Sequence, residues 1–148
     1  MSNYAPVLIR DASPDDAATV AAIYRPIVER TTISFELDAP DEAEMRSRIV
    51  EITRRYPWLV AVDDVSAYVD EAARQHSIGR TLYTELFARL AQAGTFHRAF
   101  AGIALSNDAS IAFHQRFGFE PVGIYREVGY KFGRWIDVSW WQRGIETS

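Results

Sequence analysis

The order of apolar and polar positions at the start of the chain predicts a strand and then a helix. Residues 7–10 alternate and are rich in aliphatic side chains, as a short strand is. Ser13-Pro14-Asp15-Asp16 is typical of a helix start, with a capping serine, a proline and two acidic residues near the positive end of the dipole. Apolar residues then recur at helical spacing from Val20 to Ile27, whereas 30–38 has no clear period and predicts a loop.

The middle of the chain alternates again between helical and extended patterns. A second predicted helix begins at Asp41 and ends at Tyr56-Pro57, because the residue before a proline disfavours helical geometry. Residues 58–62 and 65–69 are apolar runs of strand length. A third helix is predicted over 78–91.

The last third of the chain has the same alternation. Residues 100–105 predict a strand, and Asn107 can cap a fourth helix that ends at Gly118. Two closing strands are predicted over 119–128 and 132–142. Helices that alternate with strands predict an α/β fold, and we expect one domain over residues 1–148.

Composition narrows the class of partner. The 148 residues carry a net charge of −4 with no block of Lys or Arg, which argues against nucleic acid and anionic membranes as partners. No apolar stretch approaches about 20 residues, and the start lacks a signal-peptide pattern. The absence of cysteine excludes thiolate chemistry and disulfides. Together these features favour a cytoplasmic protein, and the spacing of the histidines predicts no metal site.

A candidate phosphate site lies in Arg74-Gln75-His76-Ser77-Ile78-Gly79-Arg80, predicted to be a turn between a strand and a helix. Backbone N–H groups at a helix start bind anions, small residues let a phosphate approach, and the two arginines add positive charge. A polar loop that only caps the helix would have the same pattern. The stretch alone does not decide between these interpretations.

Two motifs together favour the phosphate site over a loop that only caps the helix. The loop just described resembles the pyrophosphate loop of the GCN5-related N-acetyltransferase superfamily, with Ser77 in place of its first glycine. Residues 107–114, Asn-Asp-Ala-Ser-Ile-Ala-Phe-His, followed by Gly118-Phe119, resemble the next motif of that superfamily in the right order and spacing. The resemblance implies a mixed, splayed central sheet flanked by four helices, with acetyl-CoA as co-substrate.

The closing stretch, residues 123–143, is similar to the phosphinothricin acetyltransferase branch of the superfamily. Residues 31–36 resemble the substrate loop of that branch, and 56–61 its second strand. The resemblance therefore covers nearly the whole chain. It implies transfer of an acetyl group to the amino group of a small amino-acid-like substrate of the phosphinothricin or methionine sulfoximine and sulfone type, by a protein expected to be a homodimer.

One stretch departs from that branch. Ala61-Val62-Asp63-Asp64 passes straight into 65–70, where the family has about two dozen more residues, enough for a strand with its loops. That stretch usually supplies a carboxylate base. Either the protein has lost it, or residues are missing from the sequence; the second interpretation is favoured because losing a central strand would expose edges and core. With a true loss, Asp64 becomes the candidate base, although a turn residue is the favoured alternative.

The resemblance assigns the remaining cofactor contacts. Pantetheine would pair with the backbone of the 65–69 strand, at Val65, Ala67 and Val69. Asn107 and Ser110 would share a helical face towards it, with Asn107 capping the helix as well. His114 takes the place of a tyrosine that protonates the leaving thiolate, and is expected to donate to the CoA sulfur. A helix histidine held by a backbone carbonyl is the alternative.

The acceptor amine is expected to meet residues from two segments. Phe35 and Glu36 would help wall its pocket, and Lys131 and Arg134 could bind a substrate carboxylate or phosphinate. A packing or surface role is an equal alternative for all four. Acetylation of an antibiotic or a polyamine, a CoA-binding module without catalysis, and a pure interaction protein that dimerises through its C-terminal strands are the competing functions.

Overall fold

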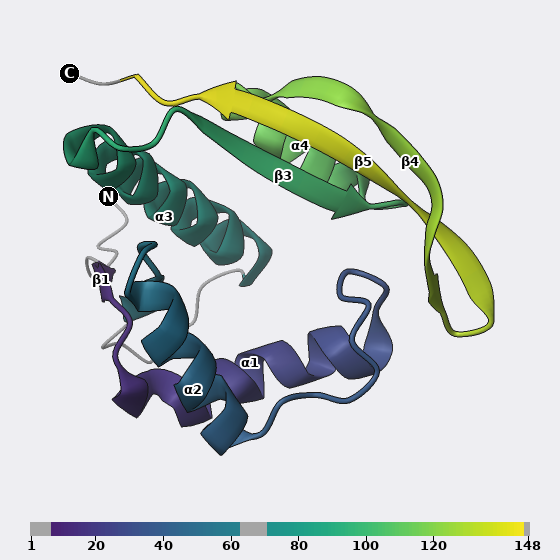
Figure 1. Ribbon diagram of the computed structural model, residues 1–148, viewed down its shortest axis with the longest axis horizontal. Coiled ribbons are helices and arrows are strands. Elements are labelled where there is room, and N and C mark those ends of the chain that lie inside the picture. The colour runs from purple at the N-terminus through teal and green to yellow at the C-terminus, as the bar shows by residue number, and fades with distance from the viewer. Residues whose placement is uncertain (1–6, 63–70, 147–148) are drawn as a thin grey trace.

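The structure, a computed structural model, describes residues 7–62 and 71–146, with the backbone alone for 71–76. The helices are α1 (Ala17–Arg30), α2 (Glu42–Thr53), α3 (Glu71–Ala93) and α4 (Asp108–Arg116), with a 3-10 turn η1 (Pro14–Asp16) before α1. The strands are β1 (Leu8–Asp11), β2 (Leu59–Val62), β3 (Arg98–Ala104), β4 (Glu120–Lys131) and β5 (Arg134–Gly144). Figure 1 shows two layers, with β1, α1 and α2 in one and α3, α4 and the β3–β5–β4 sheet in the other.

The first layer packs α1 and α2 against a short antiparallel pair of strands. β1 runs against β2, with Leu8 opposite Val62 and Asp11 opposite Leu59. Asp41 caps α2 by accepting a hydrogen bond from the Glu44 N–H at 2.8 Å, as predicted. Small side chains on α1 let the two helices approach, and the buried cluster between them consists of Ala12, Ala17, Ala21, Met45 and Ile49.

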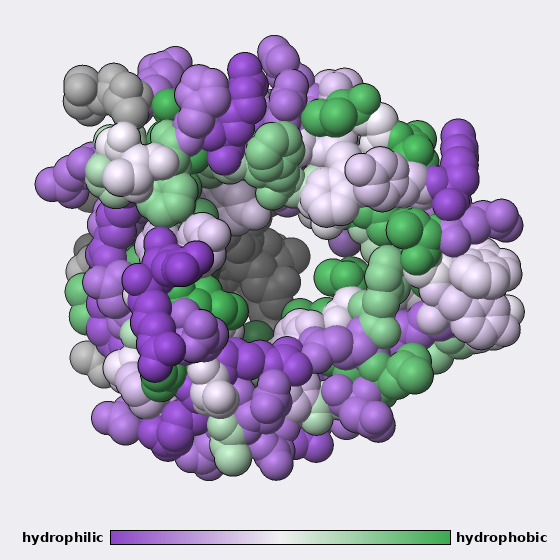
Figure 2. All heavy atoms as spheres, viewed as in Figure 1, coloured by the Kyte–Doolittle hydropathy of each residue, from purple (hydrophilic) through white to green (hydrophobic). Residues whose placement is uncertain are grey.

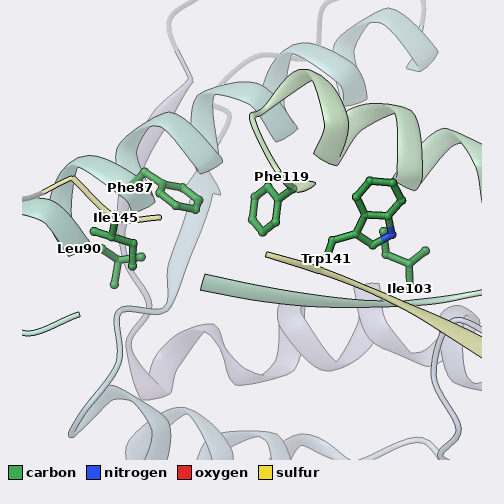
Figure 3. Packing of buried hydrophobic residues seen from close by; sticks show 6 residues of the cluster. All are labelled: Phe87, Leu90, Ile103, Phe119, Trp141 and Ile145. Atoms are coloured by element: carbon green, nitrogen blue, oxygen red, sulfur yellow. The ribbon is translucent and has the colours of Figure 1, made fainter. Parts of the chain in front are cut away.

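The second layer is an antiparallel sheet in the order β3–β5–β4, with α3 and α4 packed against a shared apolar cluster. Figure 3 shows its six buried residues, Phe87, Leu90, Ile103, Phe119, Trp141 and Ile145. Asn107 caps α4 by accepting from the Ser110 N–H at 3.2 Å. Gly133, at a φ of 75°, makes the turn between β4 and β5, where a side chain would be strained.

Most predicted elements are confirmed, but the third helix is not where the sequence placed it. The helix begins at Glu71 instead of Ile78, so residues 71–77 are helical. The strand predicted over 65–69 lies outside the described residues, as does the junction at Asp63 to Ser66. The described strands pair into two antiparallel sheets, and the molecule is hollowed at the centre of the face in Figure 2.

The full sequence of 148 residues runs without interruption through the junction. The junction itself lies outside the described residues, so the interpretation that residues are missing from the sequence stays a prediction, and so does a true loss. In the given sequence, β2 ends at Val62 and α3 begins at Glu71.

Candidate active site

The expected phosphate loop is helical. Residues 74–80 lie inside α3, so the N–H groups of 75–80 face the preceding turn of the helix. The prediction that the amides of 75–80 converge at a helix start is therefore wrong. A Cβ added at Gly79 would lie 3.6 Å from the Phe113 ring, which places Gly79 at the contact between α3 and α4.

An arginine cavity lies beside this contact. Its volume is about 550 Å³, and its lining residues are Arg80, Thr84, Phe113, Arg116, Phe117 and Arg143. Within the described residues, none of the three arginines forms an ion pair with a carboxylate. Three guanidinium groups without local counter-charges favour an anion such as a phosphate.

The walls of the arginine cavity are ordered by aromatic contacts. The Arg143 guanidinium lies over the Phe87 ring at 4.2 Å and the Phe117 ring at 5.0 Å, measured to the ring centroids. The Phe113 and Phe117 rings are nearly parallel, 17° apart. A flat aromatic ligand group with attached phosphates suits such walls. Sequence reasoning identified Arg80 but missed Arg116 and Arg143, which fall outside both motif cores.

His114 packs against α3 and is only 8% exposed. Its Nδ1 lies 2.7 Å from the Ser110 carbonyl oxygen, which can only accept, so Nδ1 carries the proton. In the neutral ring Nε2 then accepts from the Tyr83 hydroxyl at 3.0 Å. Burial raises the pKa of Tyr83, which keeps that hydroxyl protonated. This geometry matches the alternative of a histidine held by a backbone carbonyl, and the contact of Nε2 with the Tyr83 hydroxyl occupies the other ring nitrogen.

A second cavity opens at the other end of α4. It has a volume of about 330 Å³ and is lined by Arg30, Thr31, Thr32, Ile33, Ser106, Asn107, Phe132 and Arg134. It brings the predicted Asn107 and Arg134 together, and adds Arg30 from the end of α1, which sequence reasoning missed. Two guanidinium groups here suit a carboxylate.

An apolar cavity adjoins the second one and shares Ile33 with it. Its volume is about 230 Å³, and its lining residues are Ile33, Phe35, Gly102, Ala104, Tyr125, Val128, Val138 and Trp140. The Phe35 ring lies on the backbone of Gly129, where an added Cβ would clash with it. Phe35 thus lines a cavity, and its contact with the acceptor stays a prediction.

Glu36 and Lys131 point elsewhere. Arg48 donates to Glu36 Oε1 at 2.6 Å and Tyr24 donates to Oε2 at 2.5 Å, and these contacts hold the pKa of the Glu36 carboxyl below its usual range. The Lys131 ammonium is buried and donates to two backbone carbonyls. Neither residue lines the two cavities around the 31–36 loop.

The remaining predicted residues are not tested by the described part of the chain. Asp64, Val65, Ala67 and Val69 lie outside it, and the side chains of 74–76 do as well. Residues 7–62 and 71–146 contain no cluster of three or more side chains that could ligate a metal, and no helix among them is long and apolar enough to cross a membrane.

Known proteins resemble this chain over most of its length. The phosphinothricin N-acetyltransferase of Streptomyces coelicolor is 35% identical over 172 positions, covering 98% of this chain and 100% of the relative. An L-methionine sulfoximine/L-methionine sulfone acetyltransferase of Pseudomonas aeruginosa is 32% identical, covering 95% of each. A phosphinothricin acetyltransferase from Sinorhizobium meliloti, solved with acetyl-CoA, superimposes with a TM-score of 0.83 at 32% identity, over 95% of this chain and 89% of that one.

The alignment with the Streptomyces relative has a further consequence. It extends over 172 positions against a chain of 148, so at least 24 positions have no counterpart here. The shortening noted after Asp64 is consistent with that difference. The acetyltransferase (GNAT) domain matches residues 63–140. With this match, the relatives and the shared fold, the chain belongs to the GNAT family of acetyltransferases.

Proposed function

We propose that the protein transfers the acetyl group of acetyl-CoA to the amino group of a small amino-acid-like substrate, of the phosphinothricin or methionine sulfoximine and sulfone type. Its relatives carry those names, and the structural neighbour from Sinorhizobium meliloti holds acetyl-CoA. The observation that carries the proposal is the arrangement along α4. The arginine cavity lies near Arg116 at one end of the helix, and the two acceptor-sized cavities lie near Asn107 at the other.

This arrangement suits the two ends of acetyl-CoA. The ten residues from the Asn107 cap to Arg116 span about 13 Å at about 1.5 Å per residue. The nucleotide end of the cofactor, with its phosphates and flat base, fits the guanidinium groups and aromatic walls of the arginine cavity. The pantetheine would then run along α4 towards Asn107 and Ser110. Residues 74–80 remain proposed cofactor contacts, now from the first turns of α3.

The acceptor fits the cavities at the other end. Arg30 and Arg134 would bind the substrate carboxylate, and the adjoining cavity behind Phe35 would hold its side chain. The amine lone pair attacks the thioester carbon, the C–S bond breaks, and the amine proton leaves to a base while the thiolate gains one. Asp64 remains the proposed base.

We further propose a cytoplasmic homodimer. The absence of cysteine suits a reducing compartment. The β4–β5 hairpin exposes large apolar side chains, which typically mark an interface: Val122, Ile124, Tyr125, Val128, Tyr130, Phe132 and Trp135. The negative net charge argues against nucleic acid and membranes as partners. Light scattering coupled to size-exclusion chromatography tests the dimer, since a monomer at micromolar concentration would contradict it.

Thiol release tests the activity. Purified protein with acetyl-CoA and a panel of amino acids, sulfoximines, sulfones and phosphinates should release CoA only when an acceptor is present. An antibiotic or a polyamine as the sole active acceptor would instead support the second substrate class. Stabilisation by CoA without any transfer would identify a CoA-binding module, because a ligand that binds the native state raises stability. If the protein neither transfers an acetyl group nor is stabilised by CoA, the interaction-protein hypothesis is supported.

A further inference from the structure

Lys131 is buried where a lysine is normally exposed. Only 2% of the residue is accessible at the end of β4, and its hydrogen-bond acceptors are backbone carbonyls, although its charge also helps to lower the pKa of the nearby Glu36 carboxyl. Its Nζ donates to the Val28 carbonyl at 2.5 Å and to the Ser34 carbonyl at 2.7 Å. A buried ammonium is costly unless its donors are satisfied, so this placement requires both carbonyls.

The two carbonyls belong to different segments. Val28 lies in the last turn of α1, where carbonyls lack helical partners and the helix dipole favours a positive charge. Ser34 lies in the 31–36 loop that follows. One ammonium group therefore joins the end of α1, this loop and the β4–β5 hairpin, although Lys131 is 103 residues from Val28 and 97 from Ser34 in the chain.

The far side of the loop is fixed independently. The Tyr24 hydroxyl is 2.8 Å from Ser34 Oγ and also donates to Glu36, which Arg48 holds from α2. Phe35 lies between these two anchored residues, with its ring on the Gly129 backbone. The position of this ring, which walls the apolar cavity, thus depends on anchors from α1, α2 and β4.

We propose that Lys131 is a positioning residue for the acceptor: its ammonium holds the 31–36 loop so that Ile33 and Phe35 form the walls of the two adjoining cavities. This inference rests on the proposed function for its kinetic consequence, but not for its structural one. Loss of the Lys131 ammonium should raise the KM of the amine and leave the KM of acetyl-CoA unchanged. The arginine cavity takes no residue from the loop or from β4.

The absence of cysteine allows a test at the level of one charge. Lys131→Cys introduces the sole thiol of the chain. The variant is alkylated while it is unfolded in denaturant. The cysteine thiolate displaces bromide from 2-bromoethylamine to give an ammonium side chain of the length of lysine. With 1-bromopropane it gives a neutral side chain of the same length. After refolding, the ammonium form should restore the amine KM to within about threefold, whereas the neutral form should keep it about tenfold higher or more, as loss of charged hydrogen bonds implies.

Arg126→Cys is the matched control, because Arg126 lies on the same strand with a 73% exposed side chain. Its two alkylated forms should have equal amine KM values. Equal KM values for the two forms of Lys131→Cys, or parallel rises in both substrate constants, would overturn the inference.

Hydrogen–deuterium exchange separates this inference from the proposed function. Without any substrate, peptides covering residues 31–36 should exchange faster in the neutral form than in the ammonium form, while peptides from α3 and α4 should not differ. A wild-type protein that transfers no acetyl group would refute the proposed function and leave this readout intact. Equal exchange in the two forms, or a difference spread over the whole chain, would refute the positioning role itself.

Discussion

Replacing His114 by phenylalanine distinguishes a packing residue from a proton donor. The substitution keeps a buried ring and removes both nitrogen contacts, to the Ser110 carbonyl and to the Tyr83 hydroxyl. The Ser110 carbonyl keeps its place in the α4 hydrogen-bond ladder, whereas the Tyr83 hydroxyl loses the partner that the structure gives it. We therefore expect the cost to fall on stability and to arise mainly at Tyr83.

The magnitude follows from that unsatisfied hydroxyl. Leaving a buried polar group without a partner costs about 1–3 kcal/mol. At about 2–4 °C per kcal/mol for a domain of this size, the melting temperature should fall by about 2–12 °C. Turnover should stay within about twofold of wild type, because both ring nitrogens already have partners inside the protein and Nε2 contacts the Tyr83 hydroxyl. A general acid would instead contribute about 10²- to 10⁴-fold to the rate.

Urea unfolding gives the loss of unfolding free energy, and steady-state thiol release on the same preparation gives the turnover. Tyr83→Phe is the matched variant, since it removes the other partner of the same hydrogen bond and keeps both rings. The double variant should be less destabilised than the sum of the single variants, because the two groups share one contact. A fall in turnover of about 100-fold or more with unchanged stability would restore His114 as the donor and refute this reasoning.

Three further perturbations test the rest of the site. Arg143→Ala should raise the KM of acetyl-CoA about tenfold by removing a charged contact to phosphate, and an equal rise for the amine would contradict that assignment. Arg134→Ala should raise the amine KM about tenfold instead, with acetyl-CoA binding by calorimetry unchanged. Because Arg48 lowers the pKa of Glu36, their pairing stabilises the protein above the usual carboxyl pKa of about 4.3 and is lost as pH falls through the lower native pKa. Urea unfolding should therefore show Glu36→Gln less stable than wild type at neutral pH, with the difference vanishing in acid; a constant difference would exclude this linkage.

Local signals predicted most of the fold. The caps at Asp41 and Asn107 are short-range hydrogen bonds between residues three apart, so their sequence pattern was sufficient. The start of α3 was misplaced for an instructive reason. Residues 71–75, Glu-Ala-Ala-Arg-Gln, are all strong helix formers, and propensity alone would have extended the helix to Glu71. The resemblance to a phosphate loop outweighed that signal.

The site itself depends on contacts that periodicity does not contain. Arg143 follows an ordinary strand pattern, and only the fold brings it over Phe87 and Phe117. The sequence leaves Lys131 open between a substrate contact and a surface or packing role. Its acceptors lie about 100 residues away and are backbone carbonyls, which leave no trace in side-chain patterns. Residue types in the sequence predict which chemical groups are present at the site. They do not predict the direction in which each side chain points.

The short connection after β2 affects the catalytic base of the proposed site but not its binding cavities. The segments that line the proposed cofactor path lie outside residues 63–70. The arginine cavity comes from α3, α4 and β5. The proposed acceptor cavities come from the 31–36 loop and the β3–β5–β4 sheet. What the family usually places in the shortened stretch is a base and one sheet strand. Binding and alignment of the two substrates can therefore persist without that stretch, and such alignment alone supplies several kcal/mol of a bimolecular barrier. The catalytic contribution most exposed to the shortening is proton removal from the amine, the step for which Asp64 is the proposed base.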